Sequence, residues 1–449
     1  MKKHYIMVLL LSFWFAATPV LAQEDSPQTG DLEVKLQVRP RAEFRNGAFT
    51  LRAPDQDPAF FITNRARVSA YYGTDRLNLG FSGQNYSVYG STPQIETEGT
   101  FMLNEAWAEL LASSWAFRIG RQQLTYDGDR ILGTLDWHQS GRWHDALLTK
   151  YRGEHLKLDV ALAWNQNQEN QFGIAYDPGT GQPYKAMQMV RLENKFSEKV
   201  DLSAIFLNLG FQRFDDNSNP ISGMNNFQTV GLNLVYTPRD WMVKLIGYYQ
   251  FGDDAGGISS DAYFGSLRLD YMPSDSRWSF LAGVDYVSGN EATIVDNPGE
   301  GDALLTYDVA DQNAFNPLYG THHIYYGLMD YFFVTPDSYG KLGLFDKYFG
   351  VAFKASSKFS LDVAVHHFNG GAKILDSTGD DDGNYLGTEV DLSFKYVIMK
   401  DVVMTGGYQQ MFADDNMQLL KNKPEAEDTQ NVVWLMVNIN PTIFKRKMN

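Results

Sequence analysis

Arginines at alternate positions of several segments have the type and spacing to recognise anions. A guanidinium group is planar, always charged and carries a fork of N–H donors that matches a carboxylate. A row of such groups along one wall would pass a polyanion from site to site, each contact being weak enough to release it. Alternatively, the arginines could pair with carboxylates of the same wall and brace it. These arginines are Arg39, Arg41, Arg45, Arg65, Arg67, Arg118 and Arg191.

A second charged group surrounds Trp137, in a turn-rich stretch between two strand-like segments at residues 115–126 and 141–151. Opposite charges at this density predict a loop held by ion pairs and hydrogen bonds. Such a loop could fold into a channel as a constriction, or it could be the ion-paired base of an extracellular loop. We favour the second, structural role, which would still shape the mouth of a pore. The residues are Arg121, Asp129, Arg130, Asp136, Arg142 and Asp145.

Motifs for catalysis or metal binding are weak. The sequence has no G-x-S-x-G, H-E-x-x-H or Walker motif, so we do not expect an enzyme. The pairs His322-His323 and His366-His367 would point to opposite faces of a strand, which argues against a metal ion on either pair. Acidic residues 376–384 keep part of a calcium-loop spacing with Glu389, although Thr378 stands at the first position. We expect a solvated acidic loop and no cofactor, with calcium as the alternative.

The chain begins with a charged segment, an apolar run over residues 6–17 and a small-residue site at Val20-Leu21-Ala22. This pattern predicts a secretory signal peptide over residues 1–22, because the apolar run is shorter than the roughly 20 residues that span a membrane. Residues 23–449 would form the mature protein as a single domain, since no linker divides them. The sequence contains no cysteine, which excludes disulfides and a lipid anchor on cysteine.

From residue 31 onward, apolar and polar residues alternate with a period of two, which is typical of strands between an apolar and a polar medium. In one segment Ala66, Val68 and Ala70 alternate with Arg65 and Arg67. Aromatic residues make up 14% of the chain, which favours a large β structure. Aromatic residues near strand ends predict the girdles of a membrane barrel: Tyr71, Tyr72, Trp115, Tyr151, Trp241, Tyr271, Trp278 and Phe359.

The connections alternate between short and long. Eight tight turns lie near residues 73–75, 113–114, 152–154, 197–199, 238–240, 273–275, 356–358 and 399–401. Nine longer loops lie near residues 46–59, 89–100, 127–140, 168–183, 214–225, 253–259, 290–341, 371–384 and 413–428. This predicts an all-β, transmembrane antiparallel β-barrel of about 18 strands in a Gram-negative outer membrane, with short periplasmic turns and long extracellular loops. Such a barrel would enclose an aqueous channel. A soluble propeller, the alternative, would show a repeated blade motif.

Two stretches resemble the alginate export family of outer-membrane β-barrels. The first comprises Gly120-Arg121-Gln122, residues 126–133 (YDGDRILG), Asp136-Trp137 and residues 141–146; the second comprises residues 319–323 (YGTHH) and 326–332 (YGLMDYF). The resemblance implies a monomeric porin with an arginine-rich, anion-favouring pore that passes an acidic polysaccharide. It does not fix the substrate, because the inner face predicted for this chain is mixed in charge.

The formal charge of −16 argues against a nucleic-acid partner, since binding phosphates needs a basic face. The alternation places carboxylates on the inner face as well, so that one wall would be basic and the opposite wall acidic. These carboxylates are Glu43, Glu105, Glu109, Asp159, Asp270, Asp285, Glu389 and Asp391. We expect passive passage of an anionic poly- or oligosaccharide such as alginate, across outer-membrane lipid, with or without a periplasmic export or uptake partner. A general or other-solute porin and a loop-plugged, surface-binding barrel are the alternatives.

Overall fold

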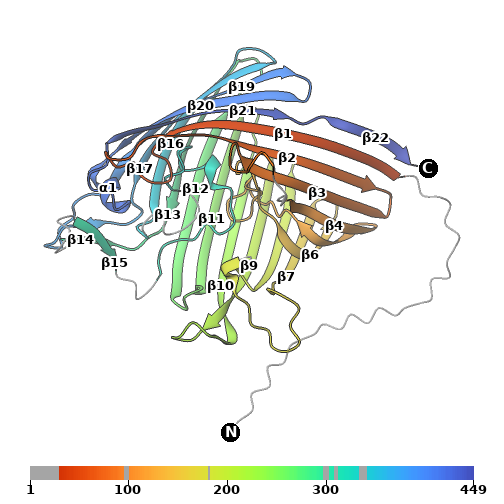
Figure 1. Ribbon diagram of the computed structural model, residues 1–449, viewed down its shortest axis with the longest axis horizontal. Coiled ribbons are helices and arrows are strands. Elements are labelled where there is room, and N and C mark those ends of the chain that lie inside the picture. The colour runs from red at the N-terminus through yellow and green to blue at the C-terminus, as the bar shows by residue number, and fades with distance from the viewer. Residues whose placement is uncertain are drawn as a thin grey trace, which may run out of the picture.

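The computed structural model describes residues 30–95, 101–180, 183–296, 303–307, 312–332 and 341–448; the predicted signal peptide at residues 1–22 lies outside them. The described chain forms a closed antiparallel barrel of 18 strands, in which β21 and β22 together make the last strand. Figure 1 shows the strands side by side around this barrel. The predicted fold class and strand number are confirmed.

The strands of the first half are β1 (Gly30–Asn46), β2 (Ala59–Gly73), β3 (Leu77–Val88), β4 (Met102–Ala112), β5 (Trp115–Gln122), β6 (His144–Arg152), β7 (Leu156–Trp164), β8 (Ala186–Ser197) and β9 (Val200–Phe214). Those of the second half are β10 (Pro220–Tyr236), β11 (Trp241–Asp253), β12 (Ser259–Tyr271), β13 (Trp278–Val287), β16 (Leu344–Lys354), β17 (Phe359–Asn369), β19 (Tyr385–Met399), β20 (Val402–Ala413), β21 (Thr429–Ile439) and β22 (Thr442–Met448).

The barrel closes where the first strand meets the last. β1 pairs with β2 along one edge and with β21 and β22 along the other. The register on that second edge shifts between Val34 and Lys35, next to the break at Asn440 and Pro441 that separates β21 from β22. Closure leaves no free strand edge, as a sheet that spans lipid requires.

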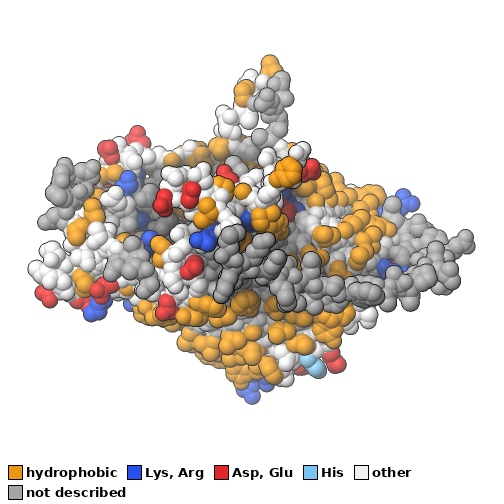
Figure 2. All heavy atoms as spheres, turned by 90° about the horizontal axis from the view of Figure 1, so that it is seen from below, with side chains coloured by type: hydrophobic (Ala, Val, Ile, Leu, Met, Phe, Trp, Pro, Cys, Tyr) orange, Lys and Arg blue, Asp and Glu red, His pale blue; other side chains and the backbone are white. Residues whose placement is uncertain are grey.

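The two faces of the barrel follow the period-two pattern of the sequence. On β2 the Arg65 side chain is 1% exposed and faces the lumen, whereas Val68 is 43% exposed on the outside. On β10 Thr229 is buried and Leu232 is exposed. Figure 2 shows hydrophobic side chains covering much of the outer surface of the barrel. This division fits a polar interior and a lipid-facing exterior.

Cross-strand aromatic pairs mark the ends of the strands next to the short turns. The ring centroids of Trp115 and Tyr151 lie 5.0 Å apart, and those of Trp241 and Tyr271 lie 4.6 Å apart. These pairs fit the predicted girdle. One predicted member is wrong: Tyr71 faces the lumen, where its hydroxyl donates to Glu105 at 3.1 Å, because it has the same parity as the inward-facing arginines. Among the described residues, no helix is long and apolar enough to cross a membrane.

The connections alternate as predicted, with one exception. The loop predicted at residues 214–225 is much shorter, because β9 continues to Phe214 and β10 begins at Pro220, and the two strands pair to their ends. The carboxylate of Asp215 accepts hydrogen bonds from the backbone N–H groups of Asn217 and Asn219, at 3.0 and 2.8 Å, and so closes the turn. Most of these polar residues therefore belong to a hairpin with a short turn, whereas the sequence pattern predicted a loop for the whole segment.

Among the described residues, L3 (residues 123–143) and L7 (residues 288–296, 303–307, 312–332 and 341–343, with η2 at His322–Ile324) place side chains in the buried cluster inside the barrel. L7 and the next loop also share a small sheet of β14 (Ala292–Asp296), β15 (Ala303–Tyr307) and β18 (Ile374–Leu375). The remaining short elements are η1 (Pro178–Thr180) and α1 (Asp415–Leu420). Side chains of L3 and L7 pack with inward-facing strand residues in one buried cluster. The aqueous channel stays a prediction, since the strand number does not reveal how much of the lumen the loops fill.

Candidate functional site

Three arginines form one basic patch on the lumen wall, which we call the arginine site: Arg39 on β1 and Arg65 and Arg67 on β2. The β1–β2 register places Arg39 directly opposite Arg65 and Gln37 opposite Arg67. Residues of equal parity on neighbouring strands share a face, so the alternation of the sequence brings the three guanidinium groups together. Like charges at this spacing repel, and the site needs a counter-charge.

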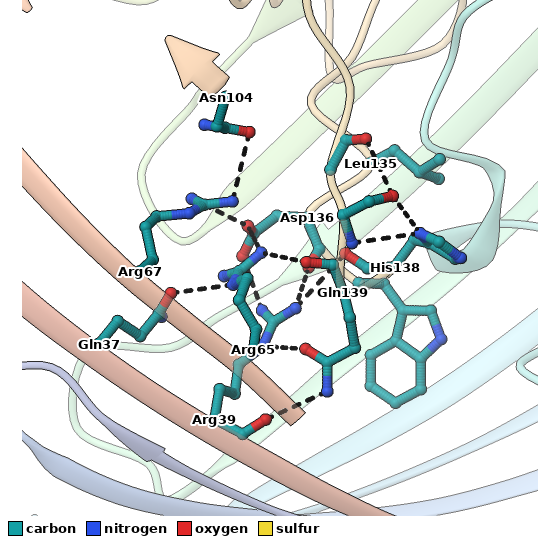
Figure 3. Close-up of polar contacts among 12 residues, drawn as sticks. Gln37, Arg39, Arg65, Arg67, Asn104, Leu135, Asp136, His138 and Gln139 are labelled. Carbon is teal, nitrogen blue, oxygen red and sulfur yellow. Dashed lines mark hydrogen bonds and ion pairs between the residues drawn. The ribbon is translucent and has the colours of Figure 1, made fainter. Parts of the chain in front are cut away.

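Asp136 of L3 supplies that counter-charge (Figure 3). Its Oδ1 lies 2.9 Å from Arg65 Nη1, and its Oδ2 lies 3.0 Å from Arg39 Nη1. Arg67 Nη1 stands 4.0 Å away, beyond hydrogen-bond distance. One carboxylate thus bridges two guanidinium groups and lies near a third.

Neutral amides complete the arginine site. Gln139 of L3 accepts from Arg39 Nε at 2.9 Å and donates to the hydroxyl of Thr63 at 3.1 Å. Gln37 accepts from Arg65 Nε at 2.9 Å, and Gln84 accepts from Arg67 Nε at 2.7 Å. These amides were not among the residues predicted from the sequence. Gln37 has the inward parity of Arg39 and could have been found by phasing, whereas nothing in the sequence singled out Gln139.

Exposure differs sharply within this site. The Arg39 and Arg65 side chains are 4% and 1% exposed, but that of Asp136 is 53% exposed. Burial alone would raise the pKa of the Asp136 carboxyl, but Arg65 and Arg39 outweigh it and hold the pKa below its usual range. The carboxylate therefore stays ionised at the border between the basic wall and accessible space.

L3 turns into the lumen through a run of left-handed residues. Asp127, Gly128 and Asp129 have φ angles of 53°, 79° and 65°. Glycine adopts this region freely, and aspartate tolerates it better than most residues. The YDGD sequence therefore permits the sharp reversal that carries L3 away from β5.

Two further ion pairs fix L3 to other walls of the barrel. Asp127 binds Arg191 of β8, with Oδ1 to Nη2 at 2.8 Å, and also accepts from the hydroxyl of Ser203 on β9. Arg130 binds Asp285 of β13 at 2.6 Å, with both side chains almost fully buried. Together with Asp136, these contacts hold L3 at three places around the lumen.

The other predicted arginines brace the wall or the loops. Arg41 and Arg45 each bind Glu43 at 2.7 Å, and Arg41 also lies 4.1 Å from the centroid of the Trp137 ring. Arg118 binds Glu109 at 3.0 Å on neighbouring strands. These pairs correspond to the alternative in which arginines pair with carboxylates of the same wall and brace it.

The base of L3 is also ion-paired. Arg121 of β5 binds Asp145 of β6 through two parallel hydrogen bonds, both of 2.8 Å. Arg142 donates to the carbonyl oxygen of Gly320 in L7 at 2.8 Å, and burial lowers its pKa to about 10. L3 therefore combines both predicted arrangements: an ion-paired base and a loop folded into the lumen. The ion-paired base fits the favoured structural role, and the ion pairs of Asp127, Arg130 and Asp136 with distant strands hold the loop inside the barrel.

L7 lies against L3 and against β19. Leu132 of L3 pairs with Tyr319 of L7 in an isolated parallel bridge. The backbone N–H of Met329 donates to Glu389 Oε1 at 2.8 Å, and that of Leu328 donates to Asp391 Oδ2 at 3.3 Å. L3 and the described residues of L7 therefore contact each other inside the barrel, with L3 bound to three walls and L7 bound to β19.

Carboxylates also line the lumen, but the prediction of an acidic wall opposite a basic one was wrong, because β19 is three strands from β1 across the closure and Glu43 lies on β1 itself. Buried carboxylates project inward from β12, β13, β16 and β19: Asp270, Asp285, Asp346, Glu389 and Asp391. A cavity of about 410 Å³ lies between these strands and Tyr325 and Tyr326 of L7. Within it His366 binds Asp346 at 2.9 Å, and Arg268 binds Asp270 at 2.7 Å.

The candidate metal residues are engaged elsewhere. In the described part of the chain, no group of three or more His, Asp or Glu side chains has the arrangement to hold a metal ion. His323 binds Asp330 at 2.9 Å, and Glu389 accepts from L7 rather than joining residues 376–384. In that acidic loop, Asp376 accepts hydrogen bonds from the backbone N–H groups of Thr378 and Asp380.

No protein-family model and no curated protein sequence matches the chain. Solved structures do share its fold. Pseudomonas aeruginosa OpdL is 12% identical at a TM-score of 0.60, covering 92% of this chain and 99% of its own. P. aeruginosa OpdO is 11% identical at a TM-score of 0.61, and the match covers 92% of this chain and 98% of OpdO. A variant of OccD1 (OprD) is 14% identical at a TM-score of 0.55, and the match covers 92% of this chain and 96% of OccD1.

These neighbours are outer-membrane porins, which are channels and not enzymes. At such low identity the likeness concerns the fold, which is shared over almost the whole length of both chains. The chain therefore has the fold of an outer-membrane porin. The predicted porin barrel is supported, but the comparisons do not point to the alginate export family in particular.

Proposed function

We propose that this protein is a passive outer-membrane channel, narrowed by L3 and L7, that admits small solutes carrying a carboxylate. The observation that carries the proposal is the arginine site, where Arg39, Arg65 and Arg67 face the lumen and two of them already bind one carboxylate. Planar, bidentate recognition of a carboxylate is what guanidinium groups do best. The channel would act as a monomer in outer-membrane lipid. A concentration gradient or a periplasmic partner would drive the passage of the solute.

The size of the solute follows from the two inserted loops. An alginate-type polymer carries a carboxylate on each sugar and would suit the arginine site chemically. Its passage would require L3 and L7 to move aside, which breaks the buried Arg130–Asp285 pair and the contacts of L7 with β19. A single acidic sugar or a short acidic oligosaccharide needs less displacement, and we therefore favour these.

A second candidate is a barrel plugged by its loops that binds ligands at its surface. The observation in its favour is the buried cluster inside the lumen, to which L3 contributes Ile131 and Leu132 and L7 contributes Phe315, Met329 and Phe332. Packed apolar side chains of this kind exclude water, and a complete seal would leave no conducting path.

Single-channel conductance in planar bilayers, with the reversal potential taken in a salt gradient, tests both candidates. We expect anion selectivity that falls sharply in Arg65→Ala/Arg67→Ala. The matched control is Arg239→Ala/Arg277→Ala, which removes two exposed arginines from the short turns and should leave selectivity nearly unchanged. Cation selectivity that is equal in all three proteins would refute the carboxylate channel. Negligible conductance until L7 is deleted would favour the plugged barrel.

A further inference from the structure

We infer that Asp136 determines the specificity of the arginine site by occupying it as an internal ligand, which an entering carboxylate must displace. This inference rests on the proposed function and adds to it a selection rule. A solute passes the constriction only if it replaces the Asp136 carboxylate on Arg39 and Arg65.

The three ion pairs that hold L3 differ in their access to solvent. The carboxylate side chains of Asp127 and Asp285 are 2% and 1% exposed, so an incoming solute cannot reach them. Asp127 has further partners in Ser203 and Asn233. The side chain of Asp136 is 53% exposed and is the one of the three that accessible space reaches. Exchange with an external carboxylate is therefore feasible at Asp136 alone among these anchors.

The site has spare positive charge for the exchange. Arg39, Arg65 and Arg67 carry three formal charges around the Asp136 carboxylate, which lies 4.0 Å from Arg67, and Glu105 is a further carboxylate near Arg67. The Arg67 Nε and Nη2 groups are held by Gln84 and Asn104, at 2.7 and 3.4 Å, which fixes the guanidinium plane toward the site. An incoming carboxylate can contact Arg67 first and then replace Asp136, so that no arginine is left without a counter-charge during exchange.

The backbone of L3 does not need to leave for this step. The carbonyl oxygen of Asp136 accepts from Arg39 Nη2 at 2.8 Å, and that of Trp137 accepts from Arg41 Nη1 at 2.8 Å. Gln139 holds Thr63 and the carbonyl oxygen of Arg39. Because these contacts do not involve the Asp136 carboxylate, its release requires only rotation of one half-exposed side chain. L3 can therefore stay in place while the Asp136 carboxylate leaves the arginine site.

The selection rule has a chemical consequence. A neutral sugar cannot replace a charge-assisted ion pair and meets a closed site, whereas a monocarboxylate replaces Asp136 with an equivalent group. An internal competitor lowers the apparent affinity for an external carboxylate by the fraction of time that the site is free. The channel would therefore bind its solute weakly enough to release it.

The test is a titration with glucuronate, a monocarboxylate sugar, and with glucose as its neutral counterpart. Binding is measured by calorimetry on the detergent-solubilised protein and by block of the ionic current. In Asp136→Asn we expect glucuronate to bind about tenfold more tightly than in the unmodified protein, which corresponds to about 1.4 kcal/mol, while glucose binding is unchanged. Asp136→Glu keeps the charge and should retain the weak affinity. Glu427→Gln removes a similarly exposed carboxylate that binds Arg52 and should have no effect.

Each outcome has one meaning. Equal or weaker glucuronate binding in Asp136→Asn, while the unmodified channel remains anion-selective, would overturn the internal-ligand role and leave the proposed function intact. Tighter binding with no anion flux would support the internal ligand and refute the channel. A gain for glucuronate and glucose alike would show that the substitution merely loosens L3, and would also overturn the inference. The folded state of each variant is verified beforehand by its mobility on unheated gels.

Discussion

L3 and L7 both contribute apolar side chains to the buried cluster in the lumen, but their polar contacts with the barrel walls differ. L3 reaches the barrel walls through the charged side chains of Asp127, Arg130 and Asp136. The described part of L7 is held by buried apolar side chains, such as Phe315 and Met329, and by backbone hydrogen bonds to β19. Ion pairs have direction and can be exchanged for other ions, whereas apolar burial is non-directional and excludes water. The difference indicates that L3 can exchange a partner at Asp136, the exposed one of its three ion pairs, whereas the described part of L7 offers no such exchange.

The strongest test of this comparison breaks the buried pair of L3. Asp285→Ala leaves the Arg130 guanidinium buried without its counter-charge, and removing one partner of a buried pair costs about 4 kcal/mol. We expect the free energy of unfolding in urea to fall by about this amount, with L3 becoming sensitive to protease. In the control Arg130→Met/Asp285→Leu, both charges are removed and most of the stability should return. A single variant as stable as the unmodified protein would show that L3 does not depend on this pair.

L7 should respond to the loss of apolar volume instead. Met329 is 1% exposed, and Met329→Ala should lower the stability by about 3 kcal/mol because it leaves a cavity in the packed cluster. The cost should not change between low and high salt, in contrast to that of Asp136→Asn, whose ion pairs are half-exposed. Urea unfolding at two ionic strengths measures this. A clear salt dependence for Met329→Ala would remove the distinction between the loops.

Acid should act on L3 with a smaller effect, because Asp136 is half-exposed. The pKa of Asp136 in the folded state is below the ordinary value of 3.8. The ionised carboxylate therefore contributes fully to the stability of the folded state above pH 3.8, and this contribution is lost as the pH falls through the lowered pKa. We expect the conductance of the unmodified protein to change in that acid range, and we expect part of this change to be missing in Asp136→Asn. Identical pH profiles for the two proteins would contradict the contribution of Asp136.

The smallest effect should come from ion pairs between the extracellular loops. Arg52 binds Glu427 at 2.7 Å, but Glu427 is 48% exposed. Exposed pairs contribute little, so Glu427→Gln should change the free energy of unfolding by less than about 1 kcal/mol. A loss as large as that of Asp285→Ala would mean that exposure does not rank the ion pairs of this barrel.

The barrel could be predicted because its signal is local. The period-two alternation around Arg65 and Arg67 fixes which side chains face inward, and one error of phase would reverse every side chain of a strand. Turn residues such as those at 238–240 then separate the strands. The same local rules misjudged the β9–β10 connection, where the strands pair up to Phe214 and Pro220 around a short turn.

The constriction could not be predicted in full because its contacts are distant in the sequence. Asp136 lies 97 residues from Arg39 and 71 from Arg65, and no sequence pattern predicts which arginine will bind a given loop carboxylate. Phasing placed the arginines in the lumen but left open whether solute or protein would bind them. Gln139 could not be predicted either, because it reaches Arg39 and Thr63 only when L3 folds into the lumen.

The closure of the barrel has a consequence for how the chain folds. A hydrogen bond of 2.8 Å joins Gln37 of β1 to Asn438 of β21 across 401 residues of sequence. The entropy of closing so long a loop grows only logarithmically with its length, so the equilibrium cost is modest, but contacts of this separation form slowly. Until the last strand arrives, β1 has an unpaired edge. Pro441 lies beside this seam and brings no N–H to it, so the first and last strands should be the last to join during assembly and the first to separate under force.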